Sequence, residues 1–358
     1  INGGETIIFD GDDTTRFFVV NSGASLTLDG LTLQNGYNSS AGGVIRADGT
    51  LDISNSTFLD NSANIQGGAI YTYGTLTIAN STFVNNSAIY EGGAIRANGA
   101  LTITDSIFVN NSADHGKEII VEGELTISNS TFVDNSTYFD GAVVTYGITS
   151  ISNSTFVSNS TDGVGAIVAF SSITLTHNTF VSQSLVTLFI YQTTATLTHN
   201  ILSGTGALCP SDGAVLNIDS TNFANSACGS ATVVPDLGLG TFDGRVVPLL
   251  FTSPAFNASP APCAIATDQL GTPRPQGTGC DAGAVEMIIP PIHINEQQLL
   301  ASMQTQAVSH STTIYPLVLD VVSDGMIITL QDNAGQIGTA NLTLTLQDSL
   351  LQIGISET

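Results

Sequence analysis

Three residues at one repeated position form a candidate ligand-binding surface. Arg46 and Arg96 occupy equivalent positions two repeats apart, and Tyr71 holds that position between them. Guanidinium groups bind carboxylates through paired hydrogen bonds, so the three side chains predict contact with an acidic sugar. Asp48 and Glu91 lie near them in the repeat. The alternative is a stack of solvated and aromatic side chains without a ligand.

Carbohydrate chemistry would need more than this surface. A glycoside hydrolase requires two carboxylates at a controlled separation. A lyase requires a strong base, often Arg or Lys, with acidic groups around Ca²⁺. Few residues suit either role, so the sequence favours a protein without catalytic residues, and a polysaccharide lyase or hydrolase is the alternative.

Candidate metal ligands are equally sparse. Asp60, Asp134 and Asp140 fall in predicted turns and could help to bind Ca²⁺, but the chain has no D-x-D-x-D-G loop. His177 and His199 each precede an Asn, in positions of a repeated polar column, without Cys or carboxylate at ligand spacing. Solvation of the aspartates and a structural role for the histidines are favoured, so no cofactor is predicted.

A repeat of about 25 residues positions these side chains. Equivalent starts fall at Leu26, Leu51, Leu76, Leu101, Leu125, Thr149, Ile173 and Ala195. Each repeat carries three short alternating stretches separated by Asn, Ser and Gly. Such a unit cannot bury its own apolar side and must stack on its neighbours. The sequence therefore predicts an all-β parallel solenoid in which each repeat is one coil.

Three columns of residues recur within the repeat. The aromatic column, expected to stack inside the coils, is Phe58, Phe83, Phe108, Phe132, Phe156 and Phe180. The amide column, expected to hydrogen-bond between coils, is Asn61, Asn86, Asn111, Asn135 and Asn159. The glycine pairs, expected to allow a positive φ at a corner, are Gly42-Gly43, Gly67-Gly68 and Gly92-Gly93.

The charge balance restricts the partners. Asp and Glu number 30 against 6 Lys and Arg, which gives a net charge of −24. Nucleic acids and anionic membranes are excluded because both require a cationic surface. Divalent cations and basic partners remain possible. No apolar run approaches the ~20 residues of a membrane span, so membrane insertion is not predicted.

The cysteines indicate an oxidising compartment. Cys209, Cys228, Cys263 and Cys280 lie in one later stretch, and a sequential pairing is favoured among three possible connectivities. The chain begins at Ile1 without Met, which predicts a processed form of a secreted protein at the cell surface or outside the cell.

Composition divides the chain into three parts. Residues 1–286 are predicted to form coils to about residue 250 and then a disulfide-linked cap at 251–286. Residues 287–294 are expected to be a stiff linker. Residues 295–358 predict a small α+β domain, with one helix capped by Asn295 and a four-stranded antiparallel meander.

The repeats resemble polymorphic outer-membrane-protein repeats of bacterial surface β-helices, which combine Phe-x-x-Asn with Gly-Gly-Ala-Ile. The matching segments are Phe58 to Asn61, Phe83 to Asn86, Gly67 to Ile70 and Gly92 to Ile95. This resemblance implies secretion, a right-handed parallel β-helix and a surface or adhesive role. It implies no settled activity.

A second resemblance concerns the end of the predicted cap. Residues 253–263 and 268–286 are similar to the closing motif of a bacterial secreted β-helix family with a choice-of-anchor C-terminus. The matching positions are Asp268, Gly271, Arg274, Pro275, Cys280, Asp281, Gly283 and Glu286. Within this motif we expect Arg274 and Asp281 to form a buried ion pair that holds the cap.

These features favour a non-enzymatic, secreted structural or adhesive protein. The first coil is predicted to have strand edges that either an upstream segment or another molecule covers, and the C-terminal domain is predicted to contain long strands. Strand addition from one molecule to the next would then join copies head to tail into a filament. One alternative is a solenoid that binds or degrades glycans, on a host or in a biofilm. Another is a displayed adhesin with a C-terminal envelope anchor.

Overall fold

The computed structural model describes residues 1–113, 118–137, 142–159, 164–183, 186–206, 208–250, 252–288, 317–322, 325–331, 337–338, 340–347 and 350–357. The chain forms two compact units, Ile1–Met287 and Ile288–Thr358. Every regular element described in them is a β-strand. The helix expected after Asn295 lies outside the described residues.

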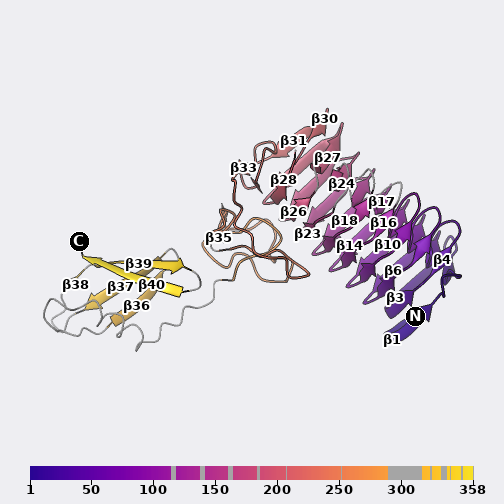
Figure 1. Cartoon of the computed structure of the whole chain (residues 1–358), viewed down its shortest axis with the longest axis horizontal. Helices are drawn as coiled ribbons and strands as arrows, with labels where there is room; N and C mark the ends of the chain where they lie inside the picture. Colours follow the sequence, from indigo (N-terminus) through magenta and orange to yellow (C-terminus); the bar gives the residue numbers. More distant parts are fainter. Residues whose placement is uncertain are drawn as a thin grey trace. The chain divides into compact units, whose positions relative to one another are not determined.

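The first unit is a parallel solenoid, as predicted, with coils stacked one above another (Figure 1). The coils up to residue 137 pass through four faces, and the described strands of the later coils lie on three of them. Face 1 begins with the first parts of β1 (Asn2–Asp10) and β3 (Ser25–Gln34), both of which continue into face 2. Its other strands are β6 (Thr50–Ser54), β10 (Leu76–Ala79), β14 (Leu101–Thr104), β18 (Leu125–Ser128), β22 (Thr149–Ser152), β25 (Ile173–Thr176), β28 (Thr194–Thr198) and β31 (Val215–Ile218). Face 2, in the same sheet, contains β7 (Thr57–Leu59), β11 (Thr82–Val84), β15 (Ile107–Val109), β19 (Thr131–Val133), β23 (Thr155–Val157), β26 (Thr179–Gln183), β29 (Ile201–Gly204), β32 (Phe223–Ala224) and β33 (Thr232–Val233).

The other two faces complete the coils. Face 3 has the short strands β4 (Tyr37–Asn38), β8 (Ser62–Ala63), β12 (Ser87–Ala88), β16 (Ser112–Ala113) and β20 (Ser136–Thr137). Face 4 is a sheet of β2 (Phe18–Val20), β5 (Ile45–Ala47), β9 (Ile70–Thr72), β13 (Ile95–Ala97), β17 (Ile119–Val121), β21 (Val143–Thr145), β24 (Val164–Ala169), β27 (Val186–Tyr191) and β30 (Ser211–Asp212).

The predicted repeat register is confirmed. The parallel pairs connect Leu26, Leu51, Leu76, Leu101, Leu125, Thr149, Ile173 and Ala195 in one column. Pairing continues to Leu216, one coil beyond the last predicted start. Strand alternation then directs every second side chain inward, so the Leu and Ile residues of each strand meet their equivalents in the next coil.

The aromatic column stacks inside the coils. The ring centroids of Phe58 and Phe83 lie 4.5 Å apart, and those of Phe83 and Phe108 lie 4.7 Å apart with an interplanar angle of 5°. The stack continues through Phe132 to Phe156 and ends at Phe180. The rings are fully buried, so the column forms a continuous part of the core.

The amide column also forms as predicted. The Nδ2 group of Asn86 donates to Oδ1 of Asn111 at 2.9 Å, and its second hydrogen bond goes to the carbonyl oxygen of Phe58 at 3.0 Å. The backbone N–H of Asn86 donates to the same Asn111 oxygen at 3.0 Å. Each buried amide thus satisfies backbone groups of its neighbouring coils, which would otherwise be costly to bury.

A second polar column was not predicted. It consists of Ser56, Ser81, Ser106, Ser130, Ser154, Asn178, Asn200 and Asn222. The backbone N–H of each member donates to the side-chain oxygen of the next. Asn replaces Ser from residue 178 onward and keeps the acceptor, so the column survives the change of residue type.

The coil corners require left-handed backbone. The first glycine of each predicted pair has a positive φ, as expected: 68° at Gly42, 62° at Gly67 and 68° at Gly92. Small polar residues take the same conformation at another corner, where Asn129 has φ 51° and Asn153 has φ 45°. Asn tolerates this region better than most residues, which explains the frequent Asn-Ser-Thr segments.

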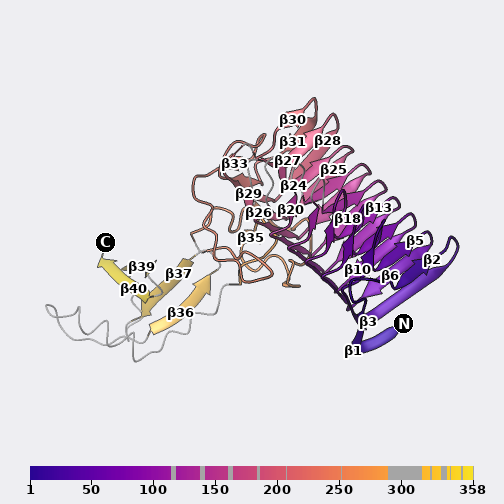
Figure 2. The same cartoon turned by 45° about the vertical axis from the view of Figure 1, so that its right-hand side comes forward.

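After β33 the chain folds back along the side of the solenoid, beside β23 and β26 (Figure 2). We call residues 234–287 the cap segment. The sequence predicted this cap beyond the last coil, but the segment packs on face 2. Val247 packs against the outward side chains of Val133 and Val157. These apolar residues on an outer surface explain the difference, because burying them favours a cover on that face.

Both predicted disulfides form. Cys209 and Cys228 are joined in the last coils, where Cys228 and Ala231 belong to the end of the core. Cys263 and Cys280 are joined within the cap segment, next to the short hairpin of β34 (Ser259–Pro260) and β35 (Gly279–Cys280). One bridge therefore fixes the last coil and the other fixes the cap segment.

The second unit contains antiparallel strands. β36 (Leu317–Val322) pairs with β37 (Gly325–Gln331), which also pairs with β38 (Ile337–Gly338). β39 (Ala340–Gln347) and β40 (Leu350–Glu357) form a separate hairpin. The antiparallel strands lie at the segments predicted for the meander, and in the described residues they form one sheet of three strands and one of two.

Candidate functional site

The Arg–Tyr–Arg column predicted from the repeat exists on the outer side of face 4. Arg46 on β5 pairs in register with Tyr71 on β9, and Tyr71 pairs with Arg96 on β13. The ring of Tyr71 also contacts Tyr73 edge-on, with centroids 5.2 Å apart. Burial raises the pKa of the Tyr71 hydroxyl. The three side chains therefore share one surface.

Carboxylates already neutralise much of this surface. Arg96 lies 2.8 Å from Glu122 and 3.6 Å from Glu91, and only 11% of its side chain is exposed. Arg46 is more open, with 46% of its side chain exposed, and lies 3.6 Å from Asp48. An acidic sugar would have to displace these partners, and only Arg46 is readily reached from solvent.

Two of the three aspartates considered for Ca²⁺, Asp60 and Asp134, lie at coil corners. Asp60 has a φ of 55° and accepts a hydrogen bond from Nδ2 of Asn85 at 3.0 Å. Asp134 has a φ of 51°, and Asp140 lies outside the described residues. Among the residues that the structure describes, no three His, Cys, Asp or Glu side chains come together as metal ligands.

A buried carboxyl group interrupts the core at Glu118. This residue holds the inward position that alanine holds in the adjacent coils, at Ala94 and Ala142. Its Oε1 lies 3.4 Å from Nδ2 of Asn111, and burial raises its pKa well above the ordinary value. The repeat pattern does not predict this environment, because it places a small residue at the position of Glu118 in the neighbouring coils.

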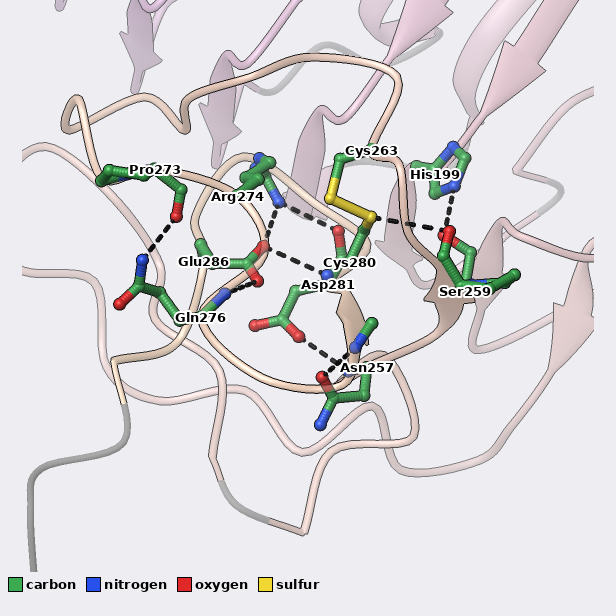
Figure 3. The surroundings of a disulfide bond; sticks show 12 residues. His199, Asn257, Ser259, Cys263, Pro273, Arg274, Gln276, Cys280, Asp281 and Glu286 are labelled. Carbon is green, nitrogen blue, oxygen red and sulfur yellow. Dashed lines mark hydrogen bonds and ion pairs between the residues drawn. A yellow bond between two sulfur atoms is a disulfide. The ribbon is translucent and has the colours of Figure 1, made fainter. Parts of the chain in front are cut away.

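The cap segment contains the most strongly connected polar cluster (Figure 3). Nη1 of Arg274 lies 2.9 Å from Oε2 of Glu286, and both side chains are buried. The same nitrogen donates to the backbone carbonyl of Asp281 at 3.0 Å, and Nη2 donates to the carbonyl of Gly283 at 2.8 Å. The guanidinium therefore organises the closing turn by binding backbone oxygens as well as one carboxylate.

The predicted ion pair between Arg274 and Asp281 is therefore wrong, because Arg274 pairs with Glu286 instead. The Asp281 carboxylate accepts the backbone N–H groups of Asn257 and Met287, both at 2.7 Å. Burial raises its pKa to about 6. Asp268 has a similar structural role, since it accepts the N–H of Glu286 at 2.9 Å. The charged residues of the motif thus hold the loop in its conformation through hydrogen bonds to its backbone. They are Asp268, Arg274, Asp281 and Glu286.

Two histidines connect the cap segment to the coils. The rings of His177 and His199 stack with centroids 4.5 Å apart, in the corner column that contains Asn129 and Asn153. Nε2 of His199 lies 2.7 Å from Oγ of Ser259 (Figure 3). The backbone N–H of Gly283 donates to the carbonyl of His199 at 2.7 Å. The histidines therefore belong to the contact between the coils and the cap segment, which the sequence did not predict.

His177 should make stability depend on pH. Burial, with the nearby charge of Arg274, lowers its pKa to about 2. Since an unfolded histidine titrates near 6.5, only the unfolded chain gains a proton as pH falls below that value. We expect His177→Asn to flatten the loss of stability between pH 6.5 and pH 4, by up to about 1.4 kcal/mol per pH unit.

Thermal melts of both proteins across this range measure the effect. Asp281 titrates in the same window with the opposite sign and is present in both proteins, so the difference between the two curves isolates His177. Parallel curves for the two proteins would contradict the assignment.

The repeat geometry and the buried columns define a parallel β-solenoid repeat protein. Its repeats match the Chlamydia polymorphic membrane protein repeat at residues 55–73 and 80–98. These two matches cover the coil segments from β7 to β9 and from β11 to β13. The chain is thus a β-helix protein with polymorphic-membrane-protein-like repeats, a type that points to a surface or adhesin-type protein.

No curated protein and no solved structure matches the chain. The family match does not extend to residues 268–286, so the resemblance of the closing motif stays a prediction. Within the described residues, no helix is long and apolar enough to cross a bilayer.

Proposed function

We propose that this chain is a non-enzymatic extracellular surface protein whose solenoid is a rigid spacer that joins other copies end to end. The observation that carries the proposal is the first coil. Among the described residues, β1, β2 and β4 each pair with a strand on one side only. A strand edge of this kind is a template for another strand.

The first coil also leaves apolar side chains accessible. Ile7 stands in register with the inward residue Leu31, but 44% of it is exposed because no described coil covers it. Phe9, Phe17 and Phe18 form an aromatic cluster beside it, with the rings of Phe9 and Phe18 5.7 Å apart. Strand addition here would satisfy backbone groups and bury this cluster in one step.

The C-terminal unit offers suitable donors. β39 and β40 each span eight residues and, within the described part of the chain, pair only with each other. Either strand could therefore add to β1 of a second copy. Because donor and acceptor surfaces differ, such a contact repeats from molecule to molecule and produces a filament when it does not close.

Sedimentation velocity of the full chain tests this function. We expect species that grow with protein concentration, and Ile7→Lys should leave mostly monomers because a charge at an edge opposes pairing. The control is Ile148→Lys, at an exposed corner away from the first coil, which should assemble like the unaltered chain. Electron micrographs of negatively stained samples should show strings.

A chain that stays monomeric at high concentration would reject the assembly. Growth that is unchanged by Ile7→Lys would reject the first coil as the acceptor. Removal of residues 295–358 distinguishes strand donation from envelope anchoring. If the shortened protein no longer forms strings, the removed part donates the strand. If it still forms strings but is released from cells, the removed part is an envelope anchor.

A further inference from the structure

Glu118 differs from the other buried carboxyl groups in how few hydrogen-bond donors it has. Among the described residues, the buried carboxylates of the cap segment are Asp268, Asp281 and Glu286, and each accepts at least two hydrogen bonds of 2.9 Å or less. Glu118 lies inside the coils and has one long contact of 3.4 Å, with Nδ2 of Asn111. Its Oε2 has no hydrogen-bond partner in the described part of the chain. A carboxylate buried with so few donors is costly, whereas the neutral acid is much less so.

The backbone of Glu118 is held by the coils on both sides. The N–H of Ala94 donates to the carbonyl oxygen of Glu118 at 3.1 Å, and the N–H of Ile119 donates to the carbonyl oxygen of Ala142 at 2.9 Å. The two alanines occupy the equivalent position in the adjacent coils, where a small side chain fits the interior. Opening of the coil at these hydrogen bonds is therefore what brings the carboxyl group of Glu118 into water.

The charged side chains of the neighbouring strands do not compensate Glu118. Arg96 on β13 lies on the outer side of face 4, where it pairs with Glu122 and Glu91. The strand on the other side, β21, has no charged residue. Lys117, next in sequence, lies outside the described residues. Burial thus has the largest effect on Glu118 and raises its pKa well above 4.5.

The position of Glu118 along the solenoid gives its coil a particular role. In the described residues, the cap segment forms hydrogen bonds with the coils from Ser130 and Thr131 onward. These residues belong to the coil that follows the coil of Glu118. The coil of Glu118 therefore lies at the boundary between the early coils and the coils that the cap segment holds together.

We propose that the coil of Glu118 is a pH-sensitive joint between these two parts of the solenoid. With a proton on Glu118 the carboxyl group is neutral and the coil stays closed. Without the proton, the negative charge favours the open coil, in which water solvates it. A carboxyl group whose pKa is higher in the closed coil stabilises that coil fully below about pH 4.5, and this stabilisation is lost as pH rises toward the higher pKa. Acid therefore tightens the joint and neutral pH loosens it, whether or not copies assemble end to end.

Hydrogen exchange of the full chain, corrected for the intrinsic exchange rate at each pH, tests the joint. Above about pH 4.5, the protection factor of the Ile119 amide should fall by up to about tenfold per pH unit until the pKa of the closed coil is reached. Glu118→Gln removes the ionisation and should abolish this dependence. Glu118→Ala introduces the residue type of the adjacent coils and should do the same. The control Glu122→Gln changes a carboxyl group that is 43% exposed, and it should keep the dependence of the unaltered chain. The Ile45 amide, in an early coil, is the reference within each protein.

Four results would overturn the proposal. The protection of Ile119 could be equal at pH 5 and pH 7, or it could rise with pH. The dependence could persist in both Glu118 variants, which would assign it to another group, such as His177 or Asp281 beside the cap segment. The Ile45 amide could lose protection as much as Ile119, which would show opening of the whole solenoid instead of one coil.

Discussion

Replacing Phe108 with alanine is expected to lower the free energy of unfolding by about 3 to 5 kcal/mol. Its ring lies in the middle of the buried stack, 4.7 Å from Phe83 and 5.0 Å from Phe132. The substitution removes contacts with two coils at once and leaves a cavity that the hydrogen-bonded coils around it cannot easily fill. Since each coil is stabilised mainly by its neighbours, the loss should spread beyond one coil.

Equilibrium unfolding in urea measures this effect. Phe170→Ala is the matched control, because Phe170 also stacks on an aromatic ring, that of Tyr146, with centroids 4.8 Å apart. Phe170 is 38% exposed, so its removal should cost only about 1 kcal/mol. Equal losses from the two substitutions would show that the buried column has no special weight.

Replacing Glu286 with glutamine should destabilise the cap segment by about 3 to 5 kcal/mol. The substitution leaves Arg274 as a buried charge without its ion-pair partner. It also replaces one of the two carboxylate oxygens with an amide NH₂ group that can only donate. Oε2 accepts hydrogen bonds from Arg274 and from the N–H of Asp281, and Oε1 accepts one from the N–H of Gln276, so either replacement loses an acceptor. The cap segment should open before the coils do.

Hydrogen exchange locates the change. The backbone amides of Asn257 and Asp281 should lose protection in Glu286→Gln, while those of the early coils keep it. Glu122→Gln is the matched control, because Glu122 lies at a similar distance from Arg96, 2.8 Å, but is 43% exposed. The Glu122→Gln substitution should lower the free energy of unfolding by at most about 1 kcal/mol. Unchanged protection of the cap segment in Glu286→Gln would contradict the role of the buried pair.

The solenoid itself could be predicted from the sequence because its periodicity is local. Phe83 and Phe108 occupy one repeat position, and the stacking of equivalent residues follows directly from parallel pairing in register. The Arg46–Tyr71–Arg96 column followed from the same rule. The sequence also placed Glu91 near this column, but it did not indicate Glu122 as a partner of Arg96, since side-chain direction at the corners is not set by the repeat.

The contacts of the cap segment could not be predicted, because they join residues far apart in sequence. Gln269 hydrogen-bonds Thr131 and Thr155, which lie more than a hundred residues earlier. One signal was available: Val133 and Val157 are apolar although they follow the inward Phe and so must face outward. The partner of Arg274 was missed because the closing turn brings Glu286 beside it and aims Asp281 at backbone amides.

The lateral position of the cap segment has a mechanical consequence. It is attached to successive coils through Thr131, Thr155 and Thr179, and to the next coil through His199. When the two ends of the solenoid are pulled apart, a coil that contacts only its neighbouring coils can unfold alone. Each such coil of about 25 residues lengthens the chain by about 85 Å. The coils that share the cap segment must yield together. Under tension we therefore expect the early coils to act as an extensible section and the later coils as the last part to fail.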